Sequence, residues 1–220
     1  MKVIYDSKGK RFYIDENNIA YPSVSTILSS ASDYPFKTQY TKTGTPKKQN
    51  KLYANIGSVI HHHCLKKYDR DVMNELPSIN EWVKNPDWVN EKIQNSYTMW
   101  CQFLTDFKPK FINVEQVIKY KNNNIRYMGR YDALAEINGK TVLIDLKTGN
   151  FYPYYQMQLS AYWASISPFP ERAMIVRCDT HPDRNPNLNY QVYVYEAKEL
   201  FEYFSEFVTT AEEYFRKNKV

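Results

Sequence analysis

The chain has 220 residues, which is long enough for one domain with a substantial apolar core. Its hydrophobic content of 43% and aromatic content of 16% exclude a disordered chain. The formal net charge of +5 permits nucleic-acid binding but does not require it. Cys64, Cys101 and Cys178 are too few and too scattered for a disulfide framework or a zinc or iron–sulfur site, so we expect reduced cysteines.

Signals for targeting and for membranes are missing from the sequence. No apolar segment follows a basic start, and no run approaches the roughly 20 apolar residues of a membrane span. We therefore expect no membrane partner and a cytoplasmic location. Tyrosine is frequent, with 20 residues, which suits base stacking as well as ordinary packing.

The N-terminal part predicts a hairpin, a helix start and a basic stretch. Residues 3–5 and 11–14 are apolar strands around a turn. Residues 21–28 (Tyr-Pro-Ser-Val-Ser-Thr-Ile-Leu) indicate a helix start, with Ser23 as N-cap or Pro22 as the first-turn proline. Residues 37–51 carry five lysines and no acid. They form either a solvated loop or a basic arm that neutralises phosphates.

Helices come first in the rest of the chain, and strands dominate after residue 110. The predicted elements are helices at 52–68 and 87–106, strands at 111–120, 125–137 and 141–147, a helix at 154–167, strands at 173–178 and 190–195, and a helix at 197–217. This order predicts the α/β class, with a mixed central β-sheet flanked by helices.

We expect residues 1–220 to form a single domain, because no linker or internal repeat divides them. Its parts are an N-terminal hairpin and basic arm (1–51), a helical part (52–110), a sheet core that would hold the catalytic groups (111–196) and a C-terminal helix (197–220).

An Asn-Gly pair at 138–139 lies between apolar runs, which is the strongest short-range signal for a hairpin. A two-residue loop pairs Ile137 with Lys140, and counting outward in that register brings Asp132 opposite Asp145. Opposed carboxylates lie roughly 5 Å apart and repel each other, unless a cation lies between them.

Lys147 follows Asp145 by two residues, so strand alternation places both on one face. Two carboxylates and an amine on one patch suit metal-assisted hydrolysis of a phosphodiester. The alternative is an edge-strand ion pair between Lys147 and the aspartates.

Three further positions are candidates. Gln158 and Tyr162 share a helix face and could grip a phosphate, or they belong to an ordinary amphipathic helix. His61 lies four residues after Gly57, whose bare backbone leaves room for a ligand beside the imidazole. The alternative is a simply packed histidine. Glu115, on the preceding strand, would complete the acidic patch or be exposed.

Taken together, these residues resemble the PD-(D/E)XK nuclease superfamily in its RecB-like exonuclease branch. Residues 21–28 also look like the N-terminal motif of phage and mitochondrial genome-maintenance exonucleases. The motifs that carry the resemblance are Gly57-x-x-x-His61, Gly129-x-x-Asp132, Asp145-x-Lys147 and Gln158-x-x-x-Tyr162.

The resemblance implies a restriction-endonuclease-like core with the order α-β-β-β-α-β and three catalytic residues, Asp132, Asp145 and Lys147. It implies that His61, Asp132, Asp145 and the Leu146 carbonyl bind Mg²⁺ or Mn²⁺. Lys147 would orient or deprotonate the attacking water. The residues implied in substrate contacts are Gln158, Tyr162, Ser23 and Thr26, the last two at a phosphate near the helix start.

The function expected from the resemblance is a metal-dependent DNA exonuclease with a preference for single strands or DNA ends. It would act in replication, recombination or repair, with DNA and a replication or recombination protein as partners. The alternatives are a structure-specific endonuclease on the same fold and a non-catalytic nucleic-acid-binding module. The Tyr/Asn/Lys-rich composition is typical of an AT-rich genome, such as that of a phage acting in the host cytoplasm.

Overall fold

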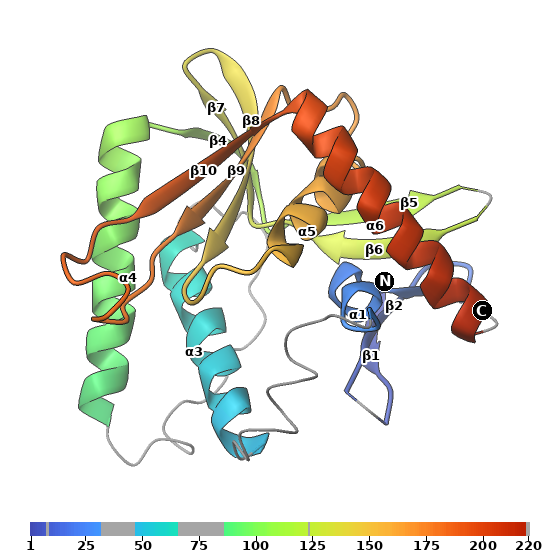
Figure 1. The fold of residues 1–220 in the computed structure, drawn as a ribbon, viewed down its shortest axis with the longest axis horizontal. Coiled ribbons are helices and arrows are strands. Elements are labelled where there is room, and N and C mark those ends of the chain that lie inside the picture. The colour runs from blue at the N-terminus through green and yellow to red at the C-terminus, as the bar shows by residue number, and fades with distance from the viewer. Residues whose placement is uncertain (8, 32–46, 66–85, 123, 219–220) are drawn as a thin grey trace.

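A mixed five-stranded sheet forms the centre of the protein (Figure 1). The computed structural model describes residues 1–7, 9–31, 47–65, 86–122 and 124–218. The strands lie in the order β10-β9-β8-β7-β4, and only β8 and β9 run parallel. Their bounds are β4 (Lys110–Val114), β7 (Ala133–Ile137), β8 (Lys140–Lys147), β9 (Arg172–Arg177) and β10 (Gln191–Glu196).

Helices cover both faces of this sheet, which confirms the predicted fold class. One face packs against α3 (Lys47–Leu65) and α4 (Pro86–Phe107), and the other against α5 (Tyr154–Trp163) and α6 (Ala197–Asn218) (Figure 1). None of the helices in the described part of the chain combines the length and the apolarity that crossing a membrane requires.

The central strand β8 is buried on both faces because helices cover it from both sides. Val142, Ile144 and Leu146 join the core beside α3 and α4, whereas Leu143 joins the core beside α5 and α6. This alternation places Val142, Ile144 and Leu146 on the face of β8 opposite to the one predicted for Asp145 and Lys147. Asp145 therefore emerges on the side of α5.

The β7–β8 hairpin has the predicted turn and register. Asn138 and Gly139 both adopt positive φ, at 51° and 76°, and Ile137 pairs with Lys140. The ladder ends at Ala133 opposite Ile144. Asp132 thus lies one residue before β7. The predicted pairing of Asp132 with Asp145 across the ladder is therefore not formed.

Two strands that the sequence predicted to be continuous are each interrupted, and the two interruptions lie side by side. The 111–120 segment divides into β4 and β5 (Val117–Lys121), and the 125–137 segment divides into β6 (Arg126–Arg130) and β7. Strands β5 and β6 form a separate two-stranded sheet. Glu115 adopts a positive φ of 54° at the break, a conformation that hydrophobic alternation does not signal.

Backbone hydrogen bonds keep the two interruptions aligned. The Glu115 amide donates to the Asp132 carbonyl at 2.9 Å, and the Tyr131 amide donates to the Gln116 carbonyl at 3.1 Å. The bend therefore places two acidic residues, Glu115 and Asp132, on adjacent segments.

The N-terminal segment forms the predicted hairpin and one strand more. Strands β1 (Lys2–Tyr5) and β2 (Arg11–Ile14) pair, and β3 (Ala20–Pro22) adds to β2 where the sequence indicated only a helix start. Ser23 then caps α1 (Val24–Leu28) as predicted, because its Oγ accepts from the Thr26 amide at 3.0 Å. A β-bridge from Ser23 to Met128 joins this unit to β6.

Two of the other helices have limits that differ from those predicted. Helix α3 begins at Lys47 and not at residue 52, so residues 47–51, predicted as the end of the basic arm, are helical. Helix α3 ends its described part at Leu65, and residues 66–68 of the predicted helix lie outside the described residues. Most of the predicted basic arm, residues 37–46, also lies outside them. Helix α5 ends at Trp163 and not at residue 167. Pro168 disfavours the helical conformation at Ser167, which is why a helix end at residue 167 was predicted too late.

Candidate active site

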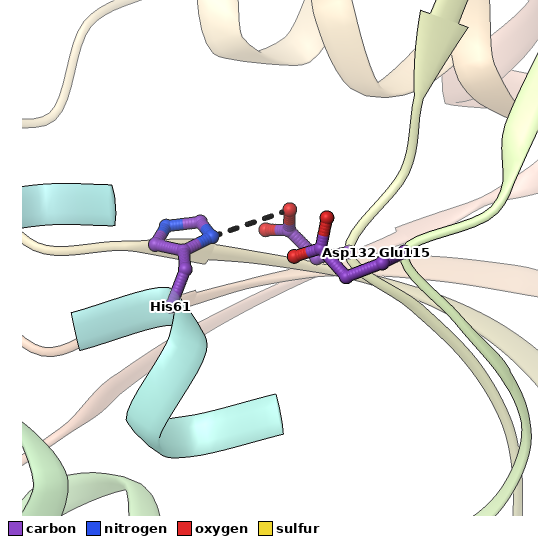
Figure 2. Close-up of side chains that lie close together, drawn as sticks. All are labelled: His61, Glu115 and Asp132. Atoms are coloured by element: carbon purple, nitrogen blue, oxygen red, sulfur yellow. Dashed lines mark ion pairs between the residues drawn. The ribbon is translucent and has the colours of Figure 1, made fainter. Parts of the chain in front are cut away.

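The interruption of the sheet gathers three ionisable side chains around one point. His61 of α3 points toward Asp132 and Glu115 at the bend (Figure 2). Its Nδ1 lies 3.3 Å from Asp132 Oδ1. Among the residues that the structure describes, His61, Glu115 and Asp132 form the group whose ligand atoms all lie within 4.8 Å of one another. One imidazole and two carboxylates thus converge.

Burial and charge act against each other at His61. Burial alone would lower the pKa of His61, but the charge of Asp132 and its contact with the imidazole raise it above the usual value. Burial would likewise raise the pKa of Asp132, and the nearby positive charges of His61 and Lys147 bring it below its usual value. Asp132 Oδ2 also accepts a 2.7 Å hydrogen bond from the Leu146 amide. Asp132 is therefore held as a carboxylate.

Asp145 and Lys147 lie beside this group, on the α5 side of β8. Lys147 Nζ lies 2.6 Å from Asp145 Oδ2, and the Asp145 side chain is only 3% exposed. The alternation predicted for this strand therefore brings the two side chains together. Asp145 is outside the 4.8 Å group, although its charge and that of Asp132 influence each other.

One ammonium is shared here between two carboxylates. Burial raises the pKa of Asp145 to about 6, and repulsion from Asp132 adds to this against the attraction of Lys147. Burial would lower the pKa of Lys147, but the charges of Asp145 and Asp132 outweigh it and raise the pKa. Asp145 and Asp132 both stabilise the Lys147 ammonium. The negative charge of Asp132, in contrast, opposes the ionisation of Asp145.

Helix α5 continues the polar contacts from Lys147. Lys147 Nζ donates to Gln158 Oε1 at 3.1 Å, and Gln158 Nε2 donates to the Tyr162 hydroxyl at 2.9 Å. Gly129 of β6 lies against this tyrosine, since an added Cβ would come within 2.5 Å of its ring. The two motifs predicted separately on β8 and α5 therefore form one hydrogen-bonded chain.

Residues at the end of β9 donate hydrogen bonds to the end of β8 and to the segment that follows it. The Cys178 amide donates to the Lys147 carbonyl at 2.7 Å, and Arg177 Nε donates to the Gly149 carbonyl at 2.7 Å. Thr148 faces Gly57 of α3, whose added Cβ would lie 3.7 Å from its Oγ1. Thr148 thus occupies part of the space that the sequence had predicted to be open above His61.

Most of the predicted site residues come together, and two do not join them. Glu115, the weakest candidate, belongs to the acidic group, and Leu146 reaches Asp132 through its amide. Ser23 and Thr26 are buried in the N-terminal unit, where Ser23 caps α1 and Thr26 Oγ1 donates to the Arg11 carbonyl at 2.9 Å. Their contact with substrate stays a prediction.

A cleft of about 490 Å³ lies next to that unit, lined by Tyr5, Gly9, Lys10, Arg11, Ser25, Thr26 and Ser29. It contains no member of the His61 group. Arg11 nevertheless connects the two regions electrostatically. Burial raises the pKa of Tyr162 to about 12, and the positive charge of Arg11 counteracts that rise.

The sequence analysis missed two residues that touch the site. Arg130 Nε lies 2.7 Å from Glu115 Oε2, and the Tyr155 ring centroid lies 4.6 Å from Lys147 Nζ. Tyr155 had a signal that could have been used, because it lies one helical turn before Gln158. Arg130 had none, since its contact depends on the unpredicted break in the strands.

The donor set of the site fits a divalent cation. Carboxylates are the ligands that Mg²⁺ and Mn²⁺ prefer, and imidazole is tolerated better by Mn²⁺. Asp145 Oδ2 is buried and has no aligned hydrogen bond despite the nearby Lys147. Lys147, His61 and Arg130 face the three carboxylates of the site. Asp145 Oδ2 is the atom among these carboxylates that a cation would coordinate without displacing an aligned hydrogen bond.

Comparisons with known proteins give weak structural likenesses. The alkaline exonuclease LHK-Exo from Laribacter hongkongensis is 12% identical, with 90% of this chain and 93% of that chain covered and a TM-score of 0.37. LHK-Exo in complex with dAMP gives 14% identity, coverage of 89% and 90%, and a TM-score of 0.38. SSO0001 gives 16% identity, coverage of 72% and 74%, and a TM-score of 0.34.

Sequence comparisons add no relative to these structures. No family model matches the chain, and no curated protein matches it. Since all three TM-scores lie below 0.5, the chemistry of the site has to be judged from its own residues.

Proposed function

We propose that this protein is a metal-dependent deoxyribonuclease that acts as an exonuclease on single strands or DNA ends. The observation that carries the proposal is the arrangement of Asp132, Asp145 and Lys147 beside His61. Three elements supply these groups: α3, the bend before β7, and β8. An edge-strand ion pair between Lys147 and the aspartates would not require His61 or the Glu115 carboxylate.

His61, Glu115, Asp132 and Asp145 would hold Mg²⁺ or Mn²⁺, with the Leu146 carbonyl as a further ligand. When bound, such an ion lowers the pKa of a water molecule and offsets the charge of the phosphate. Asp132 is oriented for this task by the Leu146 amide, whose 2.7 Å hydrogen bond fixes one of its oxygens.

Lys147 acts as a donor in this proposal and not as a base. Its pKa is raised because the charges of Asp145 and Asp132 outweigh the effect of burial, so the ammonium keeps its proton. It can orient the attacking water and stabilise negative charge on the phosphate. Gln158, which accepts a hydrogen bond from the same ammonium, fixes its direction.

Gln158 would contact the backbone of the DNA strand, whereas Tyr162 is only 2% exposed and would act through its hydrogen bond with Gln158. The amide of Gln158 and the hydroxyl of Tyr162 are hydrogen-bonded to each other, so both are positioned before substrate arrives. The formal net charge of +5 is compatible with a polyanionic partner. A replication or recombination protein that delivers the DNA is a further expectation.

Linear and circular single-stranded DNA distinguish the proposed exonuclease from an endonuclease. End-labelled linear strands and closed circles are incubated with the protein and Mg²⁺ or Mn²⁺. Loss of the linear strand alone supports the exonuclease. Cutting of the circle establishes an endonuclease, and binding without cutting under either metal establishes a non-catalytic module.

A further inference from the structure

Three tyrosines, one just before α5 and two in its first turn, form an aromatic cluster beside Lys147. The Tyr152 and Tyr154 rings are nearly parallel, at 15° with centroids 5.5 Å apart. Tyr155 meets both edge-on, with centroids at 5.6 Å and 4.8 Å. We name this group the tyrosine platform.

We propose that the tyrosine platform stacks an unpaired base of the DNA strand whose phosphate lies at Lys147. The inference rests on the proposed function and deepens it, because it assigns the single-strand preference to named residues. Bases in a duplex are already stacked on their neighbours and are not offered to such a surface. A strand with free bases is bound through both its backbone and its rings.

The position of the platform relative to Lys147 supports this assignment. The Lys147 ammonium lies 4.6 Å from the Tyr155 ring centroid, and the same ammonium pairs with Asp145. Consecutive groups along this surface are thus a carboxylate, an ammonium and aromatic rings. A nucleotide carries a phosphate next to a base, so its phosphate lies at the ammonium when its base stacks on the rings.

The platform is held in place before any ligand binds. Phe151 packs on Tyr193 of β10 with ring centroids 4.4 Å apart, which anchors the segment to the sheet. Asn150 Nδ2 donates to the Tyr152 hydroxyl at 3.2 Å. Rings that are already ordered lose little conformational freedom when a base stacks on them.

The platform lies in the partly exposed first half of α5 and the segment before it, and Tyr154 and Tyr155 also pack against the core. Tyr152, Tyr154 and Tyr155 are partly exposed, whereas Leu159 to Trp163 of the same helix are buried. Tyrosine suits such a surface, because its ring offers an apolar face while its hydroxyl is hydrated. Every base has a flat face, so this contact tolerates any sequence.

Abasic DNA tests the inference directly. Single-stranded oligonucleotides with one abasic site, moved through the positions in turn, are compared with the intact strand by fluorescence anisotropy in EDTA. We expect one position at which loss of the base weakens binding by about tenfold. Tyr152→Leu and Tyr154→Leu should weaken binding of the intact strand to a similar extent. Neither variant should further weaken binding of the strand that is abasic at that position.

Conservative and distant variants complete the test. Tyr152→Phe and Tyr154→Phe keep the rings and should bind like wild type. Phe201→Ala removes an aromatic ring that is 53% exposed on α6 and should also bind like wild type. Thermal melting of each variant shows whether it is folded.

The outcomes separate this inference from the proposed function. Equal binding by wild type and both folded leucine variants, or additive effects of leucine and the abasic site, would overturn the stacking role while leaving cleavage intact. Base-dependent binding through the tyrosines supports the stacking role whether or not the protein cuts DNA. Absence of cutting would overturn only the proposed function.

Discussion

His61 Nδ1 lies 3.3 Å from Asp132 Oδ1, and this ion pair joins α3 to the bend where β6 ends and β7 begins. The contact spans the two halves of the site. Asp132 has the Leu146 amide on its other oxygen, so one carboxylate connects a helix, a bend and the central strand.

Replacing Lys147 with alanine should abolish cleavage while preserving the fold. The variant loses the donor that orients water and stabilises the phosphate, for which a decrease in rate on the order of a thousandfold is typical. Cleavage of labelled DNA measures the loss. Lys140→Ala, at the other end of β8, is the matched control and should retain activity. Full activity in folded Lys147→Ala protein would refute the role of this lysine.

Replacing Asp145 with asparagine should stabilise the metal-free protein. The raised pKa of about 6, caused by burial and Asp132, means that the folded state resists ionisation of this carboxyl. Wild-type stability in EDTA should therefore fall as the pH rises from about 4 to 6. The melting temperature of Asp145→Asn should exceed that of wild type at pH 7, by roughly 2–4 °C for each kcal/mol of relieved repulsion.

The same comparison at low pH provides the control for Asp145. Below about pH 3 the carboxyl is protonated in both folded and unfolded wild type, so the advantage of asparagine should disappear as the pH falls from 7 toward 3. An advantage that stays constant from pH 4 to 7 would show that the charge is not its cause.

Glu115 should contribute to metal binding although its sequence signal was weak. It shares the 4.8 Å group with His61 and Asp132, so Glu115→Gln removes a charged ligand. We expect the Mn²⁺ concentration that gives half of the maximal rate to rise about tenfold. Glu136→Gln, on β7 in an exposed pair with Lys110, is the matched control. Identical Mn²⁺ titrations for both variants would remove Glu115 from the site.

Gly129 should be intolerant of a side chain. An added Cβ would lie 2.5 Å from Cε1 of Tyr162, so the ring, whose hydroxyl is hydrogen-bonded to Gln158, must shift. Gly129→Ala should lose about 1–3 kcal/mol of unfolding free energy through overpacking, and cleavage should slow. Gly149→Ala meets nothing within 4 Å and should do neither. Equal melting temperatures and rates for these variants would contradict the close approach.

The ion pair between buried Asp15 and exposed Lys119 should make stability sensitive to acid. A 2.8 Å hydrogen bond from Lys119 is the main cause that lowers the pKa of Asp15 to about 2. Its contribution is complete above about pH 4 and is lost as the pH falls toward 2. Asp15→Asn should melt below wild type at pH 7, and the difference should shrink between pH 4 and 2.5. A difference that grows on acidification would reverse the sign that this pair predicts.

Local patterns in the sequence were sufficient for the hairpin and its faces. The Asn138-Gly139 turn fixed the pairing of Ile137 with Lys140, and alternation along β8 separated Asp145 from Leu146. Helical spacing placed Gln158 and Tyr162 together, as their hydrogen bond shows. These relations depend on neighbours along the chain, which is why they could be read from it.

Relations that depend on distant segments could not be read in this way. The bend at Glu115 requires positive φ in a residue that seldom adopts it, and strand alternation predicted a continuous strand. Asp132 consequently reaches β8 through the Leu146 amide and not through the ladder. The approach of Tyr155 to Lys147 likewise depends on how α5 packs on the sheet.

The most direct measurement is cleavage of end-labelled linear single-stranded DNA by wild type and Asp145→Ala, each with Mg²⁺ or Mn²⁺ and with EDTA. We predict that wild type degrades the strand only with a divalent ion and that Asp145→Ala does not degrade it. Metal-independent cleavage, or equal cleavage by the two proteins, would contradict a metal-dependent nuclease site at Asp132, Asp145 and Lys147.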